Sequence, residues 1–197
     1  MPRYVVKDTF YKKAKKEGYR ARSAYKLEEI QNRFHVIRKG DNVLDLGAAP
    51  GSWLQLESVL VGDHGKVIGL DILPIAPLAA KNAVMKKADI REIDLSTLLD
   101  EFSIPSFDVV TSDIAPNLSG IREVDDANIH ELYDAVVRVV REGLRKGGNF
   151  LIKLFFSPDF KDMASDLKPF FSKVITFKPQ ASRGVSSEIY LVCLGKR

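Results

Sequence analysis

The chain has 197 residues, of which 45% are hydrophobic and 28% are charged. This composition is too apolar for a disordered chain, and the length suits one hydrophobic core, so we expect a single domain over residues 1–197. The apolar runs are strand-sized, far below the ~20 residues that span a bilayer, and no secretory signal is visible at the N-terminus. We therefore expect a cytoplasmic protein without membrane contact, and the net charge of +4 is compatible with a polyanionic partner.

Cysteine and histidine chemistry is not expected from this chain. Cys193 is the only cysteine, so no internal disulfide can form, and its apolar surroundings in the sequence indicate a buried thiol rather than a nucleophile. His35, His64 and His130 are far apart and lack the spacing of metal ligands. We expect no metal site.

The first forty residues, about 1–40, form a basic segment with only four acidic residues, and we expect this segment to be helical and to bind RNA. Ser23 is predicted to cap a helix whose apolar positions recur at helical spacing from Ala24 to Phe34, with Arg22, Lys26 and Arg33 on the opposite side. A solvated helix face and an RNA-binding face both fit this pattern. The side chains expected to contact phosphates are Lys12, Lys13, Lys15, Lys16, Arg20, Arg22 and Arg33.

From Asn42 onward, short β-branched runs alternate with helical stretches, which is typical of a doubly wound parallel sheet. We predict helices over 125–145, ended by Gly147-Gly148, and over 158–171. Only turn-forming residues, 179–184, separate the last two strands, so we expect a terminal hairpin with an antiparallel strand at the edge. The seven predicted strands are 42–46, 66–71, 83–87, 107–112, 149–156, 173–177 and 188–194.

A glycine turn follows the first predicted strand and leads into a helix. Its spacing from Gly47 to Gly51 is G-x-x-P-G, where Pro50 removes a backbone donor, and no P-loop is present. A less anionic cofactor than a dinucleotide is therefore favoured. Asp71 ends the second strand, where an acid can meet ribose hydroxyls or cap a helix, and Asp89 follows the third strand, where it can accept from an adenine amino group or remain solvated.

Lys153 lies in an otherwise apolar strand, where an unpaired ammonium is costly. It should therefore pair with a carboxylate, lose its proton, or reach solvent as an edge lysine. Asp113 follows another apolar strand, and Glu188 begins the last strand. Composition and spacing do not by themselves bring these residues together.

Five motifs in this order resemble the FtsJ/RrmJ family of RNA ribose 2′-O-methyltransferases, and the likeness covers nearly the whole chain. The motifs are residues 17–27, 45–53, 112–117, 150–153 and 182–190. The resemblance implies a class I S-adenosylmethionine-dependent methyltransferase (Rossmann-like) α/β fold, with a seven-stranded, mostly parallel sheet, an antiparallel terminal strand and helices on both faces. Ser52 departs from the glycine of many members, and we expect it to be tolerated.

The resemblance also implies a cofactor and a catalytic group. Residues implied to line the S-adenosylmethionine site are Gly51, Trp53, Asp71, Asp89 and Asp113, and the implied catalytic tetrad is Lys26, Asp113, Lys153 and Glu188. In that tetrad, Lys153 would accept the proton of a ribose 2′-hydroxyl, its neutral form favoured by nearby Lys26, or would remain charged and steer the hydroxyl. The sequence leaves both possibilities open.

The resemblance favours a uridine in the A loop of large-subunit (23S) ribosomal RNA as the substrate, with the tRNA anticodon loop as the alternative. No single-strand RNA-binding motif is visible to provide base readout. A non-catalytic RNA-binding scaffold and a nicotinamide dehydrogenase are alternatives from other classes; the complete tetrad disfavours the first, and the glycine spacing disfavours the second. We expect a monomer.

Overall fold

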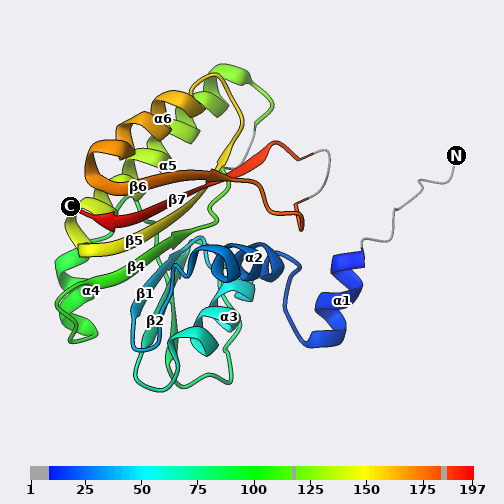
Figure 1. Cartoon of the computed structure of the whole chain (residues 1–197), viewed down its shortest axis with the longest axis vertical. Helices are drawn as coiled ribbons and strands as arrows, with labels where there is room; N and C mark the ends of the chain where they lie inside the picture. Colours follow the sequence, from blue (N-terminus) through cyan, green and yellow to red (C-terminus); the bar gives the residue numbers. More distant parts are fainter. Residues whose placement is uncertain (1–8, 117–118, 183–185) are drawn as a thin grey trace, which may run out of the picture.

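A seven-stranded sheet forms the centre of the computed structural model, which describes residues 9–116, 119–182 and 186–197. The strand order is β3-β2-β1-β4-β5-β7-β6 (Figure 1). All neighbouring pairs from β3 to β5 are parallel, whereas β7 is antiparallel to both of its neighbours. The strands are β1 Asn42–Leu46, β2 Lys66–Asp71, β3 Ala83–Lys87, β4 Phe107–Ser112, β5 Leu144–Phe155, β6 Phe171–Phe177 and β7 Glu188–Lys196.

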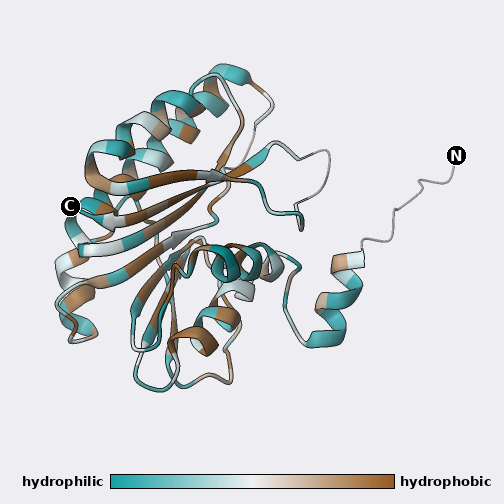
Figure 2. Ribbon diagram, in the orientation of Figure 1, coloured by the Kyte–Doolittle hydropathy of each residue, from teal (hydrophilic) through white to brown (hydrophobic). Residues whose placement is uncertain are grey.

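Helices cover both faces of the sheet and bury two separate hydrophobic clusters. Apolar side chains of α2 and α3 pack on one face, and those of α4, α5 and α6 pack on the other. Figure 2 shows the hydrophobic residues concentrated on the strands, whereas α1 is mostly hydrophilic. The helices are α1 Thr9–Glu17, α2 Ala24–Phe34, α3 Ser52–Val61, α4 Leu95–Glu101, α5 Arg122–Gly143, α6 Phe160–Leu167 and the 3-10 helix Lys168–Phe170.

The antiparallel terminal strand expected from the sequence is confirmed as β7, but it lies inside the sheet rather than at its edge. The terminal hairpin is confirmed, but β7 pairs with β5 on one side and β6 on the other, so β6 is the edge. Burial explains this order: four consecutive residues of β7, Tyr190–Cys193, are buried, whereas β6 exposes Ser172 and Lys173. A strand that is apolar on both faces is typical of an interior position.

The long helix ends earlier than predicted, and β5 begins earlier. α5 stops at Gly143, and Leu144 already pairs with Phe107 of β4. Gly147, with φ +75°, and Gly148 therefore lie within β5, where the register between β4 and β5 shifts. These glycines accommodate an irregularity in the strand rather than ending the helix.

Ser23 does not cap α2 through its side chain, which corrects a second expectation. Its backbone is already helical, with φ −60° and ψ −21°, and its hydroxyl lies 2.7 Å from the Ser52 hydroxyl at the start of α3. Ser23 thus joins two helices. Across the described ranges, the helices lack the combination of length and apolar character that a bilayer-spanning segment needs.

Candidate active site

A cavity of about 410 Å³ opens at the carboxyl ends of β1, β2 and β4, where ligands bind in doubly wound sheets. Gly47, with φ +77°, forms its floor, and a Cβ atom there would lie 2.6 Å from the Ile114 side chain. The turn after β1 therefore requires glycine at this position. The cavity is lined by Gly47, Ala49, Asp71, Ile72, Leu73, Asp89, Ile90, Arg91, Asp113, Ile114, Ala115, Pro116, Asn128, Glu131 and Leu132.

Asp71 is fixed at the mouth of the glycine turn. Its Oδ2 accepts a hydrogen bond from the Ala49 amide at 2.9 Å, and its Oδ1 accepts one from the Leu73 amide at 2.8 Å. No helix follows β2 directly, because residues 72–82 are irregular, so Asp71 does not cap a helix. Asp71 lines the cavity, and its contact to ribose hydroxyls stays a prediction.

Asp89 also lines the cavity, but its carboxylate already has a partner. Arg91 donates to both oxygens, with the shortest contact at 2.5 Å, and also reaches Glu131 at 3.4 Å. The hydrogen bond from Arg91 lowers the pKa of Asp89 below its ordinary value, although partial burial opposes the shift. Arg91 therefore bridges two walls of the cavity.

Gly51 and Trp53, two further predicted cofactor residues, are not among the residues that line this cavity. Gly51 has φ +101°, and a Cβ atom there would lie 2.8 Å from Nη1 of Arg20. Trp53 is buried, and its indole nitrogen donates to the Ser23 carbonyl at 2.9 Å. In this structure both residues shape the turn that leads into α3 rather than the cavity wall.

The four residues of the expected tetrad form two ion pairs. Lys153 Nζ lies 3.2 Å from Asp113 Oδ1 and donates to the Asp113 backbone carbonyl at 2.5 Å. Lys26 Nζ lies 2.6 Å from Glu188 Oε2. Both lysines are buried, with 5% of Lys26 and 7% of Lys153 exposed.

Tyr190 connects the two ion pairs, and sequence reasoning gave it no role. It is the direct partner of Lys153 between β7 and β5, and its hydroxyl donates to Asp113 Oδ1 at 2.9 Å. Its ring centroid lies 5.9 Å from Lys26 Nζ. Burial, with help from Asp113, raises the pKa of Tyr190 well above its ordinary value, so the hydroxyl remains a donor. Its place two residues after Glu188 puts both on one face of β7, a signal visible in the sequence.

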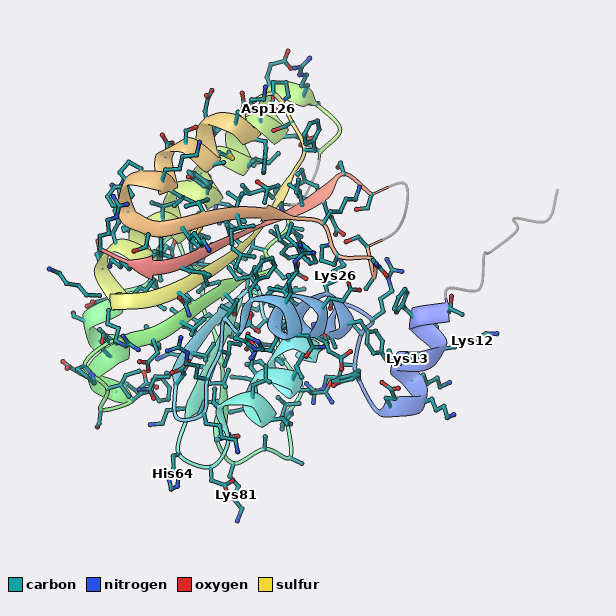
Figure 3. The ribbon with its side chains drawn as sticks, viewed as in Figure 1. Lys12, Lys13, Lys26, His64, Lys81 and Asp126 are labelled. Carbon is teal, nitrogen blue, oxygen red and sulfur yellow. The ribbon has the colours of Figure 1, made fainter. Side chains whose placement is uncertain are left out.

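Lys26 does not lie on an exposed basic face, which corrects the expectation for α2. It points to the sheet side of the helix, towards β7, with Lys12 and Lys13 on the separate helix α1 (Figure 3). Burial alone would raise the pKa of Glu188, but the hydrogen bond and charge of Lys26 lower it below its ordinary value. Glu188 therefore stays ionised and holds the Lys26 ammonium in place.

The predicted RNA-contacting residues fall into different environments. Lys12, Lys15 and Lys16 are exposed on α1, and Lys13 lies 4.4 Å from the Tyr25 ring centroid. Arg33 lies against the Phe34–Phe177 ring pair, with its Cζ 5.5 Å from the Phe34 centroid and 5.1 Å from the Phe177 centroid. Arg22 is half-buried. Arg20 instead donates to backbone carbonyls of the protein.

Within the residues that the structure describes, histidine, cysteine and acidic side chains form no group of three that could hold a metal ion. His64, labelled in Figure 3, lies on the turn between α3 and β2, away from Lys26. Cys193 is buried, and burial raises the pKa of its thiol to about 12. The thiolate that a nucleophile requires is therefore disfavoured.

The family model described as FtsJ-like methyltransferase matches residues 19–196. The chain belongs to the FtsJ-like methyltransferase family. Among the most similar proteins is the Ribosomal RNA large subunit methyltransferase E of Bdellovibrio bacteriovorus, 43% identical over 98% of this chain and 99% of that protein. The protein of the same name from Methanothrix thermoacetophila is 46% identical over 94% of this chain and 71% of its own length.

Solved structures agree with this FtsJ-like fold. A putative ribosomal RNA methyltransferase from Plasmodium falciparum superposes with a TM-score of 0.79 at 27% identity, over 90% of this chain and 98% of that chain. A putative rRNA methylase from Clostridium thermocellum, with a TM-score of 0.57 and 16% identity over 86% of this chain and 96% of that one, supports the fold alone. The class I methyltransferase fold expected from the sequence is therefore confirmed.

Proposed function

We propose that this FtsJ-like methyltransferase transfers a methyl group from S-adenosylmethionine to a ribose 2′-hydroxyl of large-subunit ribosomal RNA. The proposal rests on one observation: Asp113 lines the cavity and also forms an ion pair with Lys153, so the expected tetrad borders the cavity. A hydroxyl next to Lys153 would thus lie at the border of the cofactor site. This arrangement suits group transfer better than a passive RNA-binding surface.

The residues of the cavity suit S-adenosylmethionine. Among the described residues, four carboxylates and one guanidinium line it: Asp71, Asp89, Asp113, Glu131 and Arg91. Such a wall favours hydroxyls, an amino group and a cationic sulfonium, and it disfavours the pyrophosphate of a dinucleotide. Asp71 would hold the ribose and Asp89 the adenine amino group, the latter by sharing its oxygens with Arg91. When bound, S-adenosylmethionine supplies an electrophilic methyl group on a sulfonium.

Lys153 has the geometry of a proton acceptor. A neutral amine has two hydrogens and one lone pair, and the two hydrogens match the two contacts to Asp113, at its carbonyl and at Oδ1. The lone pair is then available to the ribose hydroxyl, whose oxygen becomes more nucleophilic as its proton moves to Nζ. The Asp113 carboxylate would stabilise the resulting ammonium. Glu188 holds Lys26 in place beside Tyr190, whose hydroxyl donates to the same Asp113 carboxylate.

Ribosomal RNA is favoured over tRNA by the relatives. Those from Bdellovibrio and Methanothrix are both named for the large ribosomal subunit, and the first matches this chain almost end to end. A uridine of the A loop in 23S RNA is our specific candidate. Incubation of the protein with ribosomal subunits, free ribosomal RNA and tRNA, followed by mapping of 2′-O-methyl groups, should give one modified ribose in large-subunit RNA. Modification of tRNA alone, or of none of the three, would contradict the proposal.

The exposed lysines of α1 should contribute affinity through phosphate contacts. Replacing Lys12, Lys13, Lys15 and Lys16 by alanine should weaken RNA binding and reduce the slope of log K against log salt by up to about 3, because each phosphate contact contributes about 0.7–0.9. The matched control replaces four other exposed lysines, Lys146, Lys161, Lys168 and Lys173, and should leave the slope unchanged. An equal loss of slope in both variants would show that α1 has no special role.

A further inference from the structure

Arg20 lies at the junction of three parts of the molecule. Its guanidinium donates to the Pro50 carbonyl at 3.0 Å, to the Ala76 carbonyl at 2.5 Å and to the Pro77 carbonyl at 2.6 Å. Pro50 belongs to the glycine turn after β1, whereas Ala76 and Pro77 belong to the irregular segment after β2. One side chain thus joins the N-terminal segment to both loops at the cofactor cavity.

The segment after β2, residues 72–82, receives its polar contacts in the middle from Arg20, while Ile75, Leu78 and Ala80 pack against the hydrophobic core. It contains no helix or strand, and two of its residues, Ile72 and Leu73, line the cavity. In the described part of the chain, the hydrogen bonds made by residues 74–79 are those donated by Arg20. Loss of the guanidinium would therefore leave the middle of this segment without a polar anchor.

The glycine turn is shaped to admit the same side chain. A Cβ atom at Gly51 would lie 2.8 Å from Nη1 of Arg20, so glycine at this position leaves room for the guanidinium as well as allowing its positive φ. The Arg20 amide is held in turn by Gln55 Oε1 of α3 at 2.8 Å, and Gln55 also donates to the Gly18 carbonyl at 3.0 Å. Arg20 is therefore fixed from both its backbone and its side chain.

We propose that Arg20 is a positioning residue that holds the 72–82 segment and the glycine turn in the form that binds the cofactor, and that it does not bind RNA phosphates. The proposal rests on the proposed function, because it assigns the cavity to S-adenosylmethionine. It replaces the expectation from the sequence that Arg20 is one of the residues that contact RNA phosphates, since three of the five N–H donors of its guanidinium already bind protein carbonyls. The planar, forked guanidinium suits contact with several carbonyls, which one lysine ammonium cannot reproduce on both loops.

The test compares Arg20→Ala and Arg20→Lys with Lys12→Ala, an exposed cation of α1 as the control. Calorimetry should show that Arg20→Ala raises the Kd for S-adenosylmethionine about tenfold, which is the loss of about one charge-assisted hydrogen bond, and that Arg20→Lys lies between it and the wild type. At saturating cofactor, kcat should stay within about twofold of the wild-type value. The salt slope of RNA binding should be unchanged in both Arg20 variants and reduced in Lys12→Ala.

Hydrogen exchange on the cofactor-free protein gives a second measurement that needs neither cofactor nor RNA. The amides of Leu73 and Ala49, which donate to the Asp71 carboxylate, should exchange faster in both Arg20 variants, while those of β4 should not change. The inference would be overturned if the Arg20 variants showed a reduced salt slope of RNA binding together with an unchanged Kd for S-adenosylmethionine and unchanged hydrogen exchange. That result would show that Arg20 contacts RNA phosphates. If the wild-type protein bound no S-adenosylmethionine, the proposed function would fail, and faster exchange in the variants would still support Arg20 as the anchor of the segment.

Discussion

Lys153→Ala should abolish nearly all methyl transfer, with a fall in kcat of about 10³-fold, while cofactor binding remains close to that of the wild type. A positioned base contributes roughly 10²–10⁴-fold to such a reaction, and Lys153 itself is not among the residues that line the cofactor cavity. The measurement is single-turnover transfer of a labelled methyl group to the RNA substrate, paired with calorimetry of S-adenosylmethionine binding. Lys168→Ala, an exposed lysine of the 3-10 helix, is the control and should retain full activity.

Lys153→Arg separates the two possible roles of the lysine. Arginine keeps the positive charge but does not lose its proton in proteins, so it can steer a hydroxyl but cannot accept its proton. We expect Lys153→Arg to be nearly as inactive as Lys153→Ala. Activity within tenfold of the wild type in the arginine variant would show that the residue acts as a fixed charge. Activity within tenfold of the wild type in Lys153→Ala would show that Lys153 has no role in the mechanism.

Glu57→Gln should stabilise the protein at pH 8, because Glu57 and Asp45 form a buried pair of carboxyl groups. Both are fully buried, and both contact the Thr111 hydroxyl, at 2.8 Å from Glu57 Oε1 and 3.3 Å from Asp45 Oδ1. Neither Asp45 Oδ2 nor Glu57 Oε2 has a hydrogen-bond partner in the described part of the chain. One hydroxyl hydrogen cannot satisfy two carboxylates, so the pair must retain a proton.

Burial of this pair makes stability depend on pH. Burial raises the pKa of Glu57 to about 8 from an ordinary value of 4.5, and burial together with Glu57 raises that of Asp45. The folded protein thus keeps a proton that the unfolded chain releases, so the free energy of unfolding falls as pH rises from about 4.5 to about 8. The slope is about 1.4 kcal/mol per pH unit for each such proton.

Thermal unfolding followed from pH 5 to pH 8 checks this prediction. The wild-type Tm should fall across the range, and Glu57→Gln should flatten the fall and raise stability at pH 8 by on the order of 3 kcal/mol, or roughly 10 °C in Tm. Glu123→Gln, at an exposed position of α5, is the matched control and should follow the wild-type curve. A wild-type Tm that does not change between pH 5 and pH 8 would contradict the account of the pair.

The parallel half of the fold could be predicted from the sequence because its strands are short, apolar and separated by clear turns. The predicted bounds of β1 to β4 agree with the structure. The position of β7 could not be predicted from its apolar pattern alone, since pairing partners depend on tertiary packing. One helix was missed: α4, although Asp94 caps it by accepting from the Ser96 and Thr97 amides. α1 lies within the N-terminal segment that was expected to be helical, but its bounds were not predicted.

The sequence predicted which residues form the candidate site, but it did not predict the contacts that Tyr190 and Arg20 make there. The family resemblance implied that Lys26, Asp113, Lys153 and Glu188 belong to one site, and the structure places them in two ion pairs. Their catalytic role stays a prediction. Tyr190 was missed because a tyrosine in an apolar strand is expected in the core. Arg20 was predicted to contact RNA because its positive charge can be read from the sequence. The backbone carbonyls that accept its hydrogen bonds lie thirty or more residues away along the chain, so the sequence did not indicate them.

The interior position of β7 sets an order for the maturation of the protein. Glu188 and Tyr190 lie on β7, which is synthesised after the other six strands, and β6, although made earlier, pairs only with β7 in the described sheet. A nascent polypeptide in which β7 has not yet been made or has not left the ribosomal exit tunnel therefore lacks two residues of the site and leaves β6 unpaired. Methyl transfer should begin only after β7 has joined the sheet, so chains that stop before Glu188 would not modify RNA.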